Sequence, residues 1–116
     1  MSEQYHEPAN ELSPQDRDII RALISLKEEV EATFWYHQRV ATASDEEIKG
    51  ILAHNRDEEM EHAVMTLEWL RRNMPGWDEV MRTYLFKDKP ILELEEEAEE
   101  EEDKPDDLGI GGFKGR

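Results

Sequence analysis

Cysteine is absent from this 116-residue sequence, so neither a disulfide framework nor a thiolate metal site can form. Any metal would have to be held by Glu, Asp and His. No apolar run approaches the ~20 residues of a membrane span, and the N-terminus lacks the pattern of a signal peptide. We therefore expect a cytoplasmic protein. Glycine is concentrated in the last eight residues, which excludes a glycine-rich phosphate-binding loop.

Basic residues are also few, with 14 against 30 acidic residues and a net charge of −16. This balance argues against binding to nucleic acid or to anionic membranes, and favours cations or a basic partner surface. Residues 93–107 alone carry a net charge of −10. We expect an N-terminal extension (1–12), a folded domain (13–92), an acidic disordered linker (93–107) and a distinct C-terminal peptide (108–116). The like charges of the linker should keep it extended or only weakly helical.

The folded domain has the pattern of a helical hairpin. A cap at Ser13, followed by proline, predicts a helix from residue 14 to about 41. Ser44 and Glu47 form a capping box for a second helix, which Asn73 and the following Pro-Gly end. A short third helix is predicted over residues 77–86. The predicted fold is all-α, an antiparallel two-helix hairpin plus a short third helix that forms a four-helix bundle by dimerisation, because two helices bury their apolar faces poorly.

One face of the second helix changes from apolar to ionisable residues. It begins with Ile48 and Leu52 and continues with Glu59, His62 and Thr66. The Glu-x-x-His pair is the spacing that ferritin-like carboxylate bundles use. With the turn centred at residues 43–44, Glu29 of the first helix lies at the level of Glu59. We expect these three residues to form half of a two-metal site, so that a second copy supplies the other half, and iron, manganese or zinc would suit it. The alternative is an exposed Glu–His pair on a solvated helix face.

Further ionisable and aromatic residues surround this level. Either they form a solvated, ion-paired surface or they are secondary cation sites. Trp35 and Tyr36 are expected to pack at the dimer seam, with a role beside the metal as the alternative for Tyr36. The acidic and histidine residues concerned are Glu28, Glu31, His54, Glu58 and Glu61.

The sequence resembles the encapsulated ferritin family over most of residues 6–92. The resemblance rests on EEVEA (28–32), WYHQRV (35–40), ILAHNRDEEMEHA (51–63), MTLEWLRR (65–72), MRTYLF (81–86) and Pro90-Ile91. At Phe34 and His37, the family commonly has acidic residues instead.

This resemblance implies a ferritin-like fold. It also implies a ferroxidase whose di-iron centre, Fe(II)/Fe(III), lies between paired chains, with dimers assembling into an annular homodecamer. Glu29, Glu59 and His62 would be the iron ligands. Tyr36 would lie beside the iron pair. Glu28, Glu31 and Trp35 would form a metal entry site, and His54, Glu58 and Glu61 a secondary metal site on the outer surface, for which calcium or zinc are also candidates.

The C-terminal residues 108–116 are, by composition, a flexible Gly-rich tail. They also resemble the peptide that loads cargo into encapsulin shells, in which Leu108, Ile110 and Phe113 would dock on the shell protein. The resemblance therefore implies iron storage inside an encapsulin nanocompartment. Two alternatives stay open: a di-iron peroxidase similar to rubrerythrin, and a non-catalytic scaffold bridged by calcium or zinc.

Overall fold

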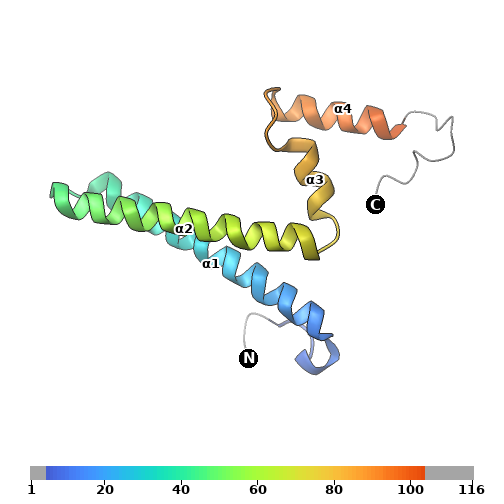
Figure 1. Ribbon diagram of the computed structural model, residues 1–116, viewed down its shortest axis with the longest axis horizontal. Coiled ribbons are helices and arrows are strands. Elements are labelled where there is room, and N and C mark those ends of the chain that lie inside the picture. The colour runs from blue at the N-terminus through green and yellow to red at the C-terminus, as the bar shows by residue number, and fades with distance from the viewer. Residues whose placement is uncertain (1–4, 104–116) are drawn as a thin grey trace. The chain divides into compact units, whose positions relative to one another are not determined.

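The computed structural model describes residues 5–103, which form helices and their connections (Figure 1). A short 3-10 helix, Ala9–Glu11, precedes α1 (Pro14–Thr42), α2 (Glu46–Asn73), α3 (Trp77–Tyr84) and α4 (Ile91–Asp103). No strand occurs within these residues, and the all-α prediction is confirmed. The chain forms two compact units, the first ending at Asn73 and the second beginning at Met74. The predicted domain 13–92 is thus divided between the two units, which are described separately below.

Helix α1 begins where its capping residues predict. The Ser13 side chain accepts a hydrogen bond from the Asp16 amide at 3.0 Å, and Pro14 occupies the first helical position. The first backbone N–H groups of a helix lack intrahelical partners. The Ser13 side chain supplies an acceptor for one of them, and Pro14 has no N–H that would need a partner. Helix α1 ends at Thr42, after which the Ala43 amide donates to the Arg39 carbonyl.

Helix α2 is capped one residue later than the sequence predicts. The Ile48 amide donates to Asp45 Oδ2 at 2.9 Å, and the Lys49 amide donates to the Asp45 carbonyl. Asp45 is therefore the N-cap, and the assignment of that role to Ser44 is wrong. Both residue types cap helices well, and α2 begins at Glu46, directly after Asp45.

Helices α1 and α2 pack against each other along the hairpin, as Figure 1 shows. Leu70 is fully buried, but the hairpin leaves many large apolar side chains exposed. Those that are at least 45% exposed are Val30, Phe34, Trp35, Ile48, Ile51, Met60, Val64 and Met65. This pattern agrees with the expectation that two helices alone cannot bury their apolar faces.

A Pro-Gly turn separates α2 from α3, as predicted. Gly76 has φ +107°, a left-handed conformation that a side chain would strain. Helix α3 then starts at Trp77, whose indole Nε1 donates to the Met74 sulfur at 3.2 Å.

Residues 93–103 of the predicted acidic linker form most of α4, so the expectation of an extended or weakly helical segment is corrected for this part. The Pro90 carbonyl accepts from the amides of Glu93 and Leu94, and Leu94 is 7% exposed. Lys89 Nζ lies 2.7 Å from Glu97 Oε2. Packing of Leu94 and this ion pair offset part of the repulsion among the acidic side chains. Residues 104–107 and 108–116 lie outside the described part of the chain.

Within residues 5–103, no helix combines the length and the apolar character that a membrane crossing requires.

Candidate metal centre

The Glu-x-x-His pair lies in the middle of α2. His62 Nδ1 is 3.8 Å from Glu59 Oε1, and the two side chains are 50% and 28% exposed, respectively. One helical turn places the carboxylate and the imidazole side by side on one face. Glu59 is the less exposed of the two, although a charged carboxylate prefers water. The pair can offer oxygen and nitrogen ligands to one ion.

Glu29 of α1 faces α2 but meets a different residue from the one expected. Its carboxylate Oε1 accepts a hydrogen bond from Thr66 Oγ1 at 3.1 Å, and Glu29 is half-buried. Thr66 lies one helical turn beyond His62. A second pair between the helices, Arg56 Nη1 with His37 Nδ1 at 3.2 Å, has its midpoint along the chain one residue earlier.

For each contact, the midpoint between the two residue numbers falls in the first turn of α2 rather than at residues 43–44. The expectation that Glu29 and Glu59 share one level of a single hairpin is therefore corrected. The spacing along each helix does not fix the register between the two helices, which depends on how their side chains pack. In the described part of one chain, no group of three or more acidic or histidine side chains is close enough to hold a metal.

Thr66 contacts the predicted ligand Glu29, although the sequence alone assigns Thr66 no role. Its position on the same face as Glu59 and His62 was visible from the helical spacing. Its partner was not, because identifying Glu29 as that partner requires the correct register between the helices. Thr66 also lines an open groove of about 320 Å³ with Arg21, Ala22, Ser25, Met65 and Trp69.

The residues assigned to metal entry lie together on α1. Glu28, Glu31 and Trp35 follow a spacing of three and four, and all three are exposed, with Trp35 47% exposed. Tyr36 is half-buried, and the Arg39 guanidinium lies over its ring, 5.2 Å from the ring centroid.

The secondary-site residues form an exposed row on α2. His54 Nε2 is 3.5 Å from Glu58 Oε2, and Glu61 follows one turn later. The side chains of His54 and Glu58 are 69% and 54% exposed, respectively. The row thus differs from Glu29 and Glu59, which are half-buried.

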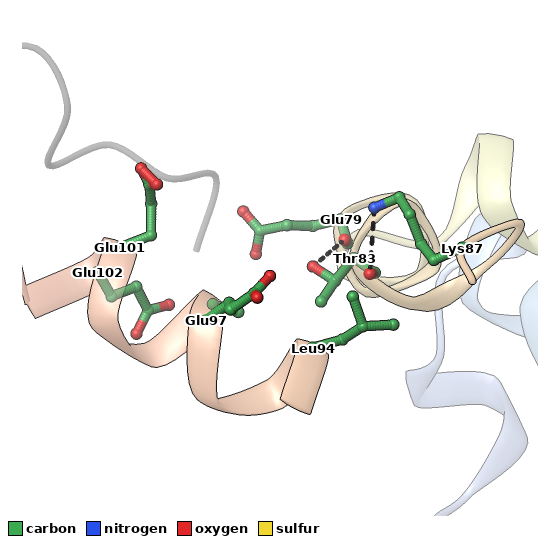
Figure 2. A pocket seen from close by; sticks show the side chains of 8 residues that line it. Glu79, Thr83, Lys87, Leu94, Glu97, Glu101 and Glu102 are labelled. Atoms are coloured by element: carbon green, nitrogen blue, oxygen red, sulfur yellow. Dashed lines mark hydrogen bonds between the residues drawn. The ribbon is translucent and has the colours of Figure 1, made fainter. Parts of the chain in front are cut away.

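A separate pocket of about 310 Å³ lies between α3 and α4. Figure 2 shows Leu94 and Glu97 of α4 facing Glu79 and Thr83 of α3 across it. None of the predicted metal ligands lines this pocket. The predicted docking residues Leu108, Ile110 and Phe113 lie outside the described residues.

Comparison with known proteins identifies the class and then the family. The helical hairpin, with carboxylates and a histidine on facing helices, defines a ferritin-like protein. A family model described as EncFtn-like matches residues 4–88. The chain therefore belongs to the encapsulated ferritin-like family, as its sequence motifs predict, and this family has an iron-related, ferritin-like function.

Individual relatives agree with this assignment. A Thermotoga maritima "Ferritin-like protein" is 67% identical over 111 residues, which cover 95% of this chain and 97% of the relative. A Rhodospirillum rubrum "Encapsulated ferritin-like protein" is 47% identical over 122 residues, covering 95% of this chain and 87% of the relative. A crystal structure of a Nitrosomonas europaea protein matches with a TM-score of 0.74 and 56% identity, over 77% of this chain and 99% of that one.

Proposed function

We propose that this protein is a ferroxidase that oxidises Fe(II) to Fe(III) with dioxygen at a site shared by two chains. Each chain would contribute Glu29, Glu59 and His62. The observation that carries this proposal is the Glu59–His62 pair, whose carboxylate and imidazole lie 3.8 Å apart on one face of α2, together with the half-buried carboxylate of Glu29 on α1. Carboxylates and an imidazole on facing helices are the ligand types of two-metal sites in helical bundles. A second chain that supplies the complementary ligands would complete the site.

The donor set fits iron. Carboxylate oxygens combined with imidazole nitrogen suit Fe(II), whereas thiolate ligands, which favour softer metals, are absent from this chain. The Glu59–His62 pair would bind an ion from one helix, and Glu29 would approach from the other chain. Membership of the encapsulated ferritin-like family supports iron over manganese or zinc as the substrate.

Self-association is part of the proposal. Trp35, Ile51 and Met65 are 47–63% exposed on the same helices as the ligands. Burying apolar area of this kind contributes about 25 cal/mol per Å², before the entropic costs of association are subtracted. Dimerisation would therefore complete both the apolar core and the metal site, and assembly of dimers into an annular homodecamer follows from the family resemblance.

The side chains would act in sequence. Glu28 and Glu31, exposed beside Trp35, would attract Fe(II) by charge, and Glu29 and Glu59 would neutralise the bound ions. Two Fe(II) ions would each give one electron, and these electrons with two protons reduce dioxygen to hydrogen peroxide. Tyr36 would lie beside the ions. The row of His54, Glu58 and Glu61 would bind further cations, including calcium or zinc.

Storage would take place inside an encapsulin shell. The name of the Rhodospirillum rubrum relative describes it as encapsulated, and residues 108–116 resemble a cargo-loading peptide. A chain truncated after residue 107 and co-expressed with an encapsulin should remain outside purified shells, whereas the full chain should co-purify with them. Co-purification of both forms would contradict this part of the proposal.

Ferroxidase activity is tested by stopped-flow absorbance after mixing assembled protein and Fe(II) with dissolved oxygen. Glu29→Ala and His62→Ala should slow Fe(III) formation by at least about tenfold, because each removes a metal ligand. Glu47→Gln and His6→Ala change exposed residues of the same types and should oxidise iron at the parent rate. Oxidation at the parent rate by the assembled ligand variants would rule out the site. Repeating the assay with hydrogen peroxide as oxidant separates a ferroxidase from a peroxidase.

A further inference from the structure

The Thr66 side chain makes a hydrogen bond that has no role in the iron oxidation proposed above. Its hydroxyl donates to Glu29 Oε1 at 3.1 Å across the two helices, and the bond is partly buried. The residues are 37 positions apart, so this hydrogen bond depends on the packing of the hairpin rather than on local helical geometry. It is made to the carboxylate that the proposed function treats as a metal ligand.

The hydrogen bond fixes one oxygen of that carboxylate. A glutamate side chain has three rotatable bonds, and ordering it upon metal binding costs conformational entropy. The Thr66 hydroxyl satisfies Oε1 in advance and directs the carboxylate toward α2. Carboxylate ligands retain further acceptor capacity on both oxygens, so the bond to Thr66 does not prevent metal binding. Partners of this kind orient ligands in many metal sites.

We propose that Thr66 is a positioning residue that holds Glu29 ready for Fe(II) before the ion arrives. This inference rests on the proposed function, because it assumes that Glu29 binds the metal. The neighbouring Thr33 provides a contrast. Its hydroxyl donates to the backbone carbonyl of Glu29 at 2.8 Å, within α1, and leaves the carboxylate untouched.

Three variants of the full chain separate positioning from packing. Thr66→Val removes the hydroxyl at nearly constant volume, and Thr66→Ser restores a hydroxyl. Thr33→Val makes the same chemical change beside Glu29 without affecting its carboxylate. Co(II), which has visible absorption bands that report its ligands, serves as the probe in anaerobic titrations. Thermal unfolding of the metal-free proteins accompanies each titration.

We expect Thr66→Val to weaken Co(II) binding by about tenfold and to alter its visible spectrum, as changes to residues that orient ligands typically do. Thr66→Ser should recover the parent affinity, and Thr33→Val should match the parent. Parent-like binding by Thr66→Val, an equal loss in Thr33→Val, or no recovery in Thr66→Ser would overturn the inference. If Thr66→Val does not fold, a Thr66→Ser variant with parent affinity and a Thr66→Ala variant with reduced affinity would support it, and equal affinities would overturn it.

A Glu29→Ala control distinguishes failure of the proposed metal site from failure of the positioning role of Thr66. If Glu29→Ala leaves Co(II) binding unchanged, the proposed site itself fails. If Glu29→Ala abolishes binding while Thr66→Val leaves it unchanged, only the positioning role fails.

Discussion

Glu68 joins two arginines near the C-terminal end of α2. Its Oε1 and Oε2 accept from Arg71 Nε and Nη2, each at 2.8 Å, and Oε2 also accepts from Arg72 Nε at 2.6 Å. The hydrogen bonds from Arg71 and then Arg72 lower the pKa of the Glu68 carboxyl to about 2. At the scale of single residues, this cluster is the clearest electrostatic feature of the hairpin.

The Glu68 cluster predicts a specific dependence of stability on pH. The pKa is lower in the folded chain than its ordinary value of 4.5, so the carboxylate stabilises the folded state above that value. The stabilisation is lost as the pH falls from about 4.5 to about 2. Glu68→Gln should therefore lower the melting temperature at pH 7, and its difference from the parent should shrink over this range. A difference that stays constant from pH 7 to pH 2, measured by circular dichroism, would contradict the assignment.

Asp45 provides a second prediction at this scale, because it is the observed cap of α2. Removing a side-chain cap costs about 1 kcal/mol of stability. Asp45→Ala should lower the free energy of unfolding by about that amount in urea denaturation. Ser44→Ala is the matched control and should change it by less than about 0.5 kcal/mol. The opposite order would show that Ser44 is the cap, as the sequence alone predicts.

At the scale of elements, α4 combines features that disfavour a helix with features that stabilise one. Most of its side chains are acidic, and no basic residue lies in its last turn. Like charges four residues apart and acids near a helix C-terminus both disfavour a helix. Its support comes from the buried Leu94 and from Lys89, whose ammonium pKa is raised by the neighbouring Glu97. Glu79 and Thr83 of α3 line the pocket that separates α3 from α4.

Lys89→Gln should therefore loosen α4. We expect faster amide exchange in a peptide covering residues 91–103, measured by hydrogen exchange and mass spectrometry at pH 7, where Lys89 is fully charged. Lys49→Gln, on α2, should leave that peptide unchanged. If exchange in residues 91–103 is the same in Lys89→Gln as in the parent, the ion pair does not stabilise the helix.

The sequence was most informative about elements whose signals are local. The Ser13 cap and its proline predict the start of α1, and Pro75-Gly76 predicts the end of α2, because these depend on nearest neighbours. The helical state of residues 93–103 could not be predicted, since it depends on burial of Leu94 and on the pairing of Lys89 with Glu97. Likewise, spacing placed Glu59 and His62 on one face, but the contact between Glu29 and Thr66 depends on the tertiary register.

At the scale of the whole molecule, the proposed metal site requires a second chain. The hairpin exposes apolar side chains beside its carboxylates, and one described chain has no complete metal-binding group. Met65 and Val64 are both 63% exposed. With about 100° of rotation per residue, Met65 lies near the His62 face of α2 and Val64 lies nearly opposite it. Met65→Asp should therefore weaken self-association, and Val64→Asp is a control of equal exposure.

The rate of Fe(II) oxidation per chain, measured across the protein concentrations over which the chains associate, tests the shared site most directly. Sedimentation velocity on the same samples gives the fraction of assembled chains. We predict that the rate per chain rises with that fraction, and that Met65→Asp shifts both curves to higher concentration together while Val64→Asp shifts neither. Separated chains that oxidise Fe(II) as fast per chain as assembled ones would contradict a site built from two chains.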